Sequence, residues 1–247
     1  MPLRPGAGVL IVAVALCGTE IRLSRGDVRR SGPVPPVLWE HWEQDVPPRP
    51  ASAVGSNPIV CSMVVSIDGR SNYALTDPAR GVRFDADGDG DLDRVAWTER
   101  GADVAFLALD RDGDGRITSG RELIGSRIFE DAANGPQALL RLSSSPGQLG
   151  SLGARDPAFA TLLLWRDVNH NGVSDAGELR RANLELSRIG LGFEPLRRVD
   201  GHGNRSRFRG WIFMRLGMPA DDDETMKSPE LDRVRQRYFY EVCLAAQ

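Results

Sequence analysis

The chain has 247 residues, of which 41% are hydrophobic and 26% are charged, and its formal net charge is −3. This composition is typical of a soluble globular protein that consists of one domain, or of one domain with extensions. No basic stretch interleaved with aromatic residues occurs, and this excludes nucleic acid from the expected partners.

Residues 1–18 have the pattern of an export signal, because Arg4 precedes a run of apolar residues that ends at Leu16. The run is short for a membrane span, so we expect no stable membrane insertion after the signal is removed, with a retained anchor or a buried strand as the alternative. Bacterial lipid attachment uses a small residue before the cysteine, and Leu16 before Cys17 argues against it. We therefore expect a secreted or periplasmic protein.

Residues 19–57 are rich in proline and have little periodicity, which indicates a linker or a loosely packed arm. Trp39 and Trp42 lie in this arm, and they are suited to dock on the chain's own domain or on an unknown protein or surface partner. The folded domain is then expected over residues 58–247.

Two cysteines remain if Cys17 leaves with the signal. Cys61 lies near the start of the expected domain and Cys243 near its end. In an oxidising compartment they form either one disulfide or two separate buried thiols, and the sequence leaves both open.

The first acidic stretch, residues 85–93, carries an aspartate at every second position. Apolar residues alternate with polar or small ones on both flanks, which predicts strands. Locally the stretch resembles the calcium hairpins of integrin-type propellers, in which an aspartate at the ninth position closes the loop. Its candidate metal ligands are Asp85, Asp87, Asp89, Asp91 and Asp93.

The second stretch begins at Asp110 and has a turn glycine, Gly115, at its sixth position and an apolar residue, Ile117, at its eighth. An EF-hand calcium loop has twelve residues and is closed by a bidentate glutamate at the twelfth. Here the glutamate comes one residue late, at position 13, and we still expect it to close the loop. The candidate ligands are Asp110, Asp112, Asp114, Arg116 at the seventh position, and Glu122.

The third stretch, residues 167–178, fits the twelve-residue loop at every ligand position. Gly172 stands at the sixth position, where the backbone must turn sharply. The eighth position is usually a large aliphatic residue that pairs two loops, and Ser174 in that place argues against docking on a partner loop. The candidate ligands are Asp167, Asn169, Asn171, Val173 through its backbone carbonyl, Asp175 and Glu178.

Two interpretations compete for these stretches, because Asp-Gly is also a common hairpin turn. Alternate aspartates in a tight turn repel one another without a cation, and the same register recurs three times, so we favour metal binding. Mg²⁺ demands octahedral geometry and keeps its waters, whereas these loops offer many flexible oxygens. We therefore expect two to three Ca²⁺ ions. The three ligand sets hold 12 of the 34 acidic residues, and three ions would change the net charge from −3 to +3.

The remaining chain predicts short helices and short strands. Helices are expected over 137–142 and 156–160, strands over 59–67, 184–191, 207–215 and 238–244, and either kind over 162–165. The starts of the acidic loops lie 25 and 57 residues apart, unlike the similar intervals of paired EF-hands. The expected fold class is α+β, with short strands and helices organised around EF-hand-like calcium loops and not a paired helical EF-hand.

Catalytic patterns are missing. The chain has three histidines and no HExxH, CxxC or Gly-x-Ser-x-Gly pattern. His170 occupies the fourth position of the third loop, where we expect it to face solvent. We therefore expect no enzymatic activity.

The order of FDADGDGDLDRVAW, FLALDRDGDGRITSGRELIG and AFATLLLWRDVNHNGVSDAGEL resembles the EF-hand-like calcium module of secreted bacterial proteins, including RTX-type toxins and adhesins. The resemblance covers about residues 58–215 and implies calcium binding and an extracytoplasmic setting, but no reaction. The chain departs from the module near residues 57–69, which lack its DxDGDG motif, and at residues 143–150, which carry no carboxylate.

These observations lead to one expected function and one alternative. We expect a secreted, non-enzymatic domain in which calcium mainly stabilises the fold. The alternative is a calcium-dependent interaction or sensor protein that exposes an apolar surface to a partner.

Overall fold

The computed structural model describes residues 60–67, 73–144, 150–215 and 235–246. Contacts divide the chain into residues 1–32 and 33–247, and all described residues belong to the second unit. The expected boundaries at residues 18 and 57 lie outside the described residues, as do Trp39 and Trp42, so the signal and the arm remain predictions.

The described part of the chain is mostly β. Eight strands form one antiparallel sheet that curls into a half-barrel, in the order β5-β8-β9-β10-β1-β4-β6-β7, and β2 and β3 form a separate hairpin. The strands are β1 Cys61–Ser66, β2 Val82–Phe84, β3 Asp93–Val95, β4 Val104–Ala108, β5 Ser151–Gly153, β6 Leu163–Trp165, β7 Leu179–Arg181, β8 Leu186–Val199, β9 Arg205–Met214 and β10 Arg235–Cys243. Two short α-helices, α1 Gly135–Leu142 and α3 Ala182–Glu185, and two 3-10 turns, Pro78–Arg80 and Pro157–Ala160, complete the described elements. The predicted α+β class is therefore wrong.

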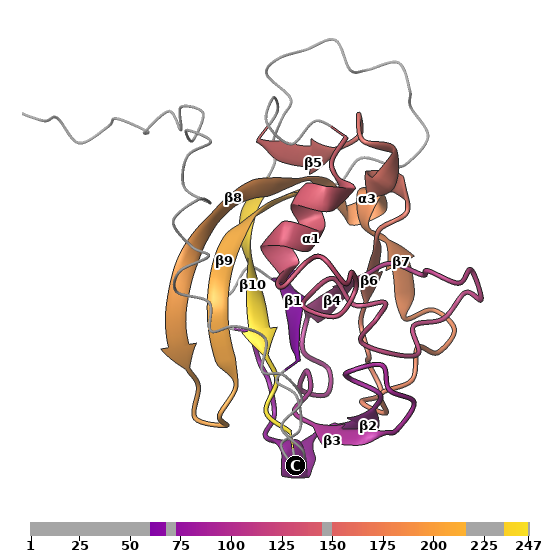
Figure 1. The fold of residues 1–247 in the computed structure, drawn as a ribbon, viewed down its shortest axis with the longest axis vertical. Helices are drawn as coiled ribbons and strands as arrows, with labels where there is room; N and C mark the ends of the chain where they lie inside the picture. Colours follow the sequence, from indigo (N-terminus) through magenta and orange to yellow (C-terminus); the bar gives the residue numbers. More distant parts are fainter. Residues whose placement is uncertain (1–59, 68–72, 145–149, 216–234, 247) are drawn as a thin grey trace, which may run out of the picture. The chain divides into compact units, whose positions relative to one another are not determined.

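The reason for this difference is that short apolar runs do not form independent helices here but pair with the sheet. Leu162–Trp165, which was open between strand and helix, contains β6, whose Trp165 pairs with Phe106 of β4. The strand expected from residue 184 begins only at Leu186, after α3. Figure 1 shows β8, β9 and β10 as long strands that curve around α1.

Two apolar clusters lie on the two faces of the sheet. Alternating residues of β1 divide between them, with Val64 in one cluster and Met63 and Val65 in the other. The cluster with Met63 also takes Leu139 of α1 and Ile212 of β9. The strand period of two therefore places one face under the acidic loops and the other under α1.

The first and last described strands lie side by side. β1 pairs with β10, and within this pair Cys61 and Cys243 are register partners that form a disulfide across 182 residues of sequence. Of the two states that the sequence left open, the structure contains the cross-link. A bond that closes so long a loop stabilises a fold by about 4–5 kcal/mol on the chain-entropy model.

Asn134 and Asp156 anchor the short helical segments. The Asn134 side chain accepts the N–H of Gln137 and so caps α1. The helix that the sequence predicts over residues 137–142 is thereby confirmed. Asp156 stands at the cap position of the turn Pro157–Ala160 but makes no cap bond. Its buried carboxylate instead accepts the Ser144 backbone N–H and the Ser144 hydroxyl, and these hydrogen bonds lower its pKa.

Glu241 of β10 is a fully buried carboxyl group. Its Oε1 accepts the Gly135 backbone N–H at 2.6 Å, and the Arg207 guanidinium lies 3.7 Å from its Oε2. Burial raises the pKa of Glu241 to about 7, although Arg207 and the Gly135 N–H act in the opposite direction. A raised folded-state pKa means that ionisation opposes folding.

We predict that Glu241→Gln removes a pH-dependent loss of stability. The contribution of the neutral carboxyl is fully present below its ordinary pKa of 4.5 and is lost as pH rises through about 7. Between pH 4 and pH 8 the wild-type free energy of unfolding should fall by about 3 kcal/mol relative to that of the variant, which keeps the acceptor for Gly135. Urea unfolding of both proteins at constant calcium measures this difference, and parallel pH profiles would contradict it.

Candidate metal centre

Each acidic loop connects two antiparallel segments. The first loop, residues 85–93, joins β2 to β3, and the third loop, residues 167–178, joins β6 to β7. The second loop, residues 110–122, leads from β4 into a returning segment in which Leu123 bridges to Ala108 and the Ile124 N–H donates to the Leu107 carbonyl. None of these three described loops is flanked by the helices of an EF-hand, so they are hairpin loops.

The same backbone pairing closes all three loops. The residue expected to close each loop pairs with the residue that directly precedes the first ligand. The pairs are Asp93 with Phe84, Glu122 with Leu109 through an N–H···O bond of 2.8 Å, and Glu178 with Arg166 through one of 3.0 Å. Because the position is set by the hairpin and not by entry into a helix, the glutamate at position 13 of the second loop has the same backbone pairing as the glutamate at position 12 of the third.

The second loop gathers three of its carboxylates. Oxygens of Asp110, Asp112 and Glu122 lie within 4.8 Å of one another, and Glu122 is only 4% exposed. Asp110 accepts the N–H groups of Gly113 and Gly115, while Glu122 accepts that of Thr118 at 2.8 Å. Asp114 accepts the Arg116 N–H and is exposed. The structure thus places Glu122 beside the aspartates at the first and third positions.

The first loop forms a second carboxylate triad. Oxygens of Asp85, Asp87 and Asp89 lie within 4.8 Å of one another, and Asp85 accepts the Gly88 N–H at 2.7 Å. Asp91 is exposed, and Asp93 begins β3. Burial, followed by the negative charges of the other four aspartates, raises the pKa of Asp93. The loop therefore concentrates negative charge.

The third loop is held by amides as much as by carboxylates. Asp175 accepts the side-chain N–H groups of Asn169 and Asn171, each at 2.8 Å, and these bonds lower its pKa. Asp167 and Glu178 are both more than nine-tenths buried. Val173 is exposed, and its N–H donates to Asn171. Among the described residues, the carboxylate triads lie in the first and second loops and not in this one.

The sixth position of each loop needs glycine. Gly90, Gly115 and Gly172 have φ angles of 100°, 79° and 73°, a region that other residues rarely adopt. Gly172 is also crowded, because a β-carbon there would lie 2.9 Å from the Arg83 carbonyl oxygen.

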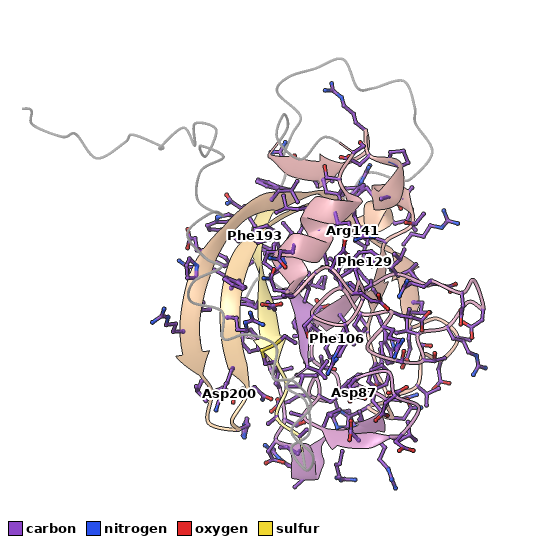
Figure 2. The ribbon with its side chains drawn as sticks, in the orientation of Figure 1. Asp87, Phe106, Phe129, Arg141, Phe193 and Asp200 are labelled. Carbon is purple, nitrogen blue, oxygen red and sulfur yellow. A yellow bond between two sulfur atoms is a disulfide. The ribbon has the colours of Figure 1, made fainter. Side chains whose placement is uncertain are left out.

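Two buried tryptophans lie beneath the third loop. The Trp97 indole N–H donates to Asp167 at 2.8 Å and that of Trp165 donates to Glu178 at 3.4 Å. Both rings pack against Phe84 and Phe106. Phe106, which is labelled in Figure 2, is fully buried, whereas Asp87, labelled below it, is partly exposed. The aromatic cluster thus fixes the first and last carboxylates of this loop, a role that the sequence pattern did not reveal.

The three loops contact one another. The Gly120 N–H of the second loop donates to the Asp85 carbonyl of the first at 2.8 Å. Ser174 of the third loop contacts Ile117 of the second, which contradicts the expectation that a serine there would prevent docking. The neighbouring loops therefore form one cluster at the β4-β6-β7 end of the sheet.

His170 is not directed into solvent as expected. Its ring nitrogens lie 2.7 Å from the carbonyl oxygens of Thr98 and Arg80, and it is partly buried. Its backbone has a φ angle of 61°, and among the described residues every other positive φ belongs to a glycine. These two contacts hold the third loop against the segments that flank the β2-β3 hairpin, and no sequence signal distinguished this role from that of a turn residue.

We predict that Trp97→Phe weakens cation binding at the third loop about tenfold, because Asp167 loses a buried donor that orients it. Trp165→Phe should have a smaller effect, since its bond to Glu178 is longer. A calcium titration followed by calorimetry compares the two variants. Equal affinities in both variants and the wild type would show that the indoles are only packing groups.

No helix within the described residues is long and apolar enough to cross a membrane.

Comparison with known proteins gives a family. A model described as the SPM domain matches residues 63–219, which include all three acidic loops. The chain is also similar to "Iron-regulated protein FrpA" of Neisseria meningitidis serogroup C, with 33% identity over 172 residues. The similar region is 68% of this chain and 15% of that protein, so the chain spans a small part of its relative's length. The relationship to a bacterial protein is therefore confirmed. The family match at residues 63–219 covers nearly the same part of the chain as the resemblance expected over about residues 58–215. These matches do not show an EF-hand.

Proposed function

This chain belongs to the SPM domain family, and we propose that it is a secreted, non-enzymatic module that binds two to three Ca²⁺ ions, which stabilise its fold. The observation that carries the proposal is the shared hairpin register, in which Asp93, Glu122 and Glu178 each pair with the residue before the first candidate ligand of their loop. In the second loop this register gathers Asp110, Asp112 and Glu122 within 4.8 Å.

The donor chemistry fits a hard cation. Ca²⁺ takes six to eight oxygens at about 2.3–2.6 Å, from carboxylates, carbonyls and water. The first loop offers five aspartates, and the second offers three aspartates, one glutamate and the Arg116 carbonyl. The third loop replaces two carboxylates with Asn169 and Asn171. Such mixed, flexible oxygen sets suit Ca²⁺ better than Mg²⁺, which requires octahedral geometry.

The charges support a stabilising role. Close carboxylates repel one another, and burial strengthens the repulsion because less water screens it. The raised pKa of Asp93 has this cause in part. A bound cation offsets the repulsion only in the folded state, so its binding free energy adds to stability.

Two further observations support the cellular setting and the absence of catalysis. The Cys61–Cys243 disulfide suits an oxidising compartment outside the cytoplasm, in agreement with the expected signal. Of the two described histidines, His170 is occupied by two backbone carbonyls and His202 lies in an exposed turn. Among the described residues, neither histidine has a serine or cysteine as a hydrogen-bond partner, so binding is the better proposal.

We predict that Glu122→Gln removes one calcium site. The loss of a closing carboxylate should weaken that site by more than the roughly 10- to 100-fold that the loss of an outer partner costs. Calorimetric titration of the chelator-stripped full chain should give two or three ions for the wild type and one fewer for the variant over the same concentration range.

Glu130→Gln is the matched control, because Glu130 is an exposed glutamate outside the loops. It should bind as the wild type does. If the chain takes up no calcium, the proposal fails. If calcium binding exposes a new apolar surface, detected by a hydrophobic dye, the sensor alternative replaces the stabilising role.

A further inference from the structure

A buried serine joins the second and third acidic loops. The Ser174 hydroxyl oxygen accepts the Ile117 N–H at 2.8 Å and lies 3.3 Å from the Ile117 carbonyl, to which it donates. The two residues are 57 positions apart, and their exposed fractions are 7% and 2%. Both stand at the eighth position of their loops. One hydroxyl thus bonds both the N–H and the carbonyl of Ile117. Without it, the backbones of the two loops would have to pair directly.

Three of the four residues on either side of this contact are candidate ligands, and the fourth, Thr118, donates to one of them. Ile117 follows Arg116 and precedes Thr118, whose N–H and hydroxyl both donate to Glu122. Ser174 lies between Val173 and Asp175. A cation that draws in the ligands of one loop therefore fixes the orientation of the peptide groups that form the contact.

Among the described residues, Ser174 is the hydrogen-bond partner of both backbone groups of Ile117. Ile117 is buried, and a buried N–H that has neither a protein partner nor water destabilises the folded loop. Disorder in one loop therefore withdraws a buried hydrogen-bond partner from the other.

We infer that the second and third loops are a coupled pair, in which Ser174 transmits the occupancy of one calcium site to the other. The inference rests on the proposed function, since it concerns affinity at the same loops. Calcium in the second loop orders Ile117, which pre-positions Ser174 and raises the affinity of the third loop, and by linkage the third loop raises that of the second to the same degree.

The two loops can be observed separately. Trp97 and Trp165 donate to Asp167 and Glu178 of the third loop, so their fluorescence reports that site. The other three tryptophans, Trp39, Trp42 and Trp211, are replaced by phenylalanine in the full chain to isolate this signal. Calcium is the titrant, and Glu122→Gln disables the second loop.

The test is a double-mutant cycle. With Ser174 present, Glu122→Gln should raise the calcium midpoint of the third loop at least about fivefold, the lower end of typical coupling between sites. In the Ser174→Ala background the same change should shift it less than about twofold. Ser174→Thr, which restores a hydroxyl, should recover the larger shift. Ser119→Ala is the control, because its hydroxyl accepts only the Arg121 N–H within one loop.

The outcomes separate the two claims. Equal effects of Glu122→Gln with and without the Ser174 hydroxyl, while calcium still binds, would overturn the coupling and leave the proposed function intact. Absence of any calcium response in the wild-type chain would overturn both. Far-UV circular dichroism at saturating calcium verifies that each variant is folded, and Ser174→Gly, which also lacks the hydroxyl, replaces Ser174→Ala if that variant does not fold.

Discussion

Electrostatic repulsion among carboxylates that the backbone holds together is the constraint on which this end of the molecule depends. Strand pairing fixes the closing residues Asp93, Glu122 and Glu178 at the mouths of their loops, whatever their charge. The hairpins therefore concentrate negative charge in the loops. Hydrogen bonds from loop N–H groups to Asp85, Asp110 and Asp167 offset part of it, and we propose that cations offset the rest.

The rest of the structure supports these loops from two directions. Below them, the Trp97 and Trp165 indoles connect the third loop to the apolar cluster on one face of the sheet. Beside them, Gly120, His170 and Ser174 connect each loop to its neighbours. Across the sheet, the disulfide holds β1 to β10 and so fixes the strand next to β4, from which the second loop emerges. Order in the loops and order in the core are therefore linked.

Local chemistry could be predicted from the sequence because it depends on neighbouring residues. Glycine at the sixth position, strands on both sides of the first loop and a helix at residues 137–142 all follow from local preferences, and the structure contains them. The glutamate at position 13 could be proposed as a ligand from its chemistry alone, and the structure places it beside Asp110 and Asp112. The ligand roles themselves stay predictions.

Long-range pairing could not be predicted. The α+β expectation was wrong because a short apolar run such as Leu162–Trp165 has the same appearance in a helix and in a strand, and only its partner β4 decides. Ser174 was judged by its side-chain size, but its hydroxyl meets a backbone 57 residues away. The hydrogen bonds of Trp97 and His170 likewise span 70 and 72 residues, and no spacing rule reveals them.

The most direct test of the account is the thermal unfolding of the full chain, with its disulfide intact, in chelator and in excess calcium. Mass action at about 100 times Kd adds roughly 2.7 kcal/mol per site, which corresponds to about 5–10 °C for a domain of this size. The account predicts a rise of at least that amount with calcium and a smaller rise with the same concentration of magnesium. An unfolding temperature that is the same in chelator and in calcium would contradict it.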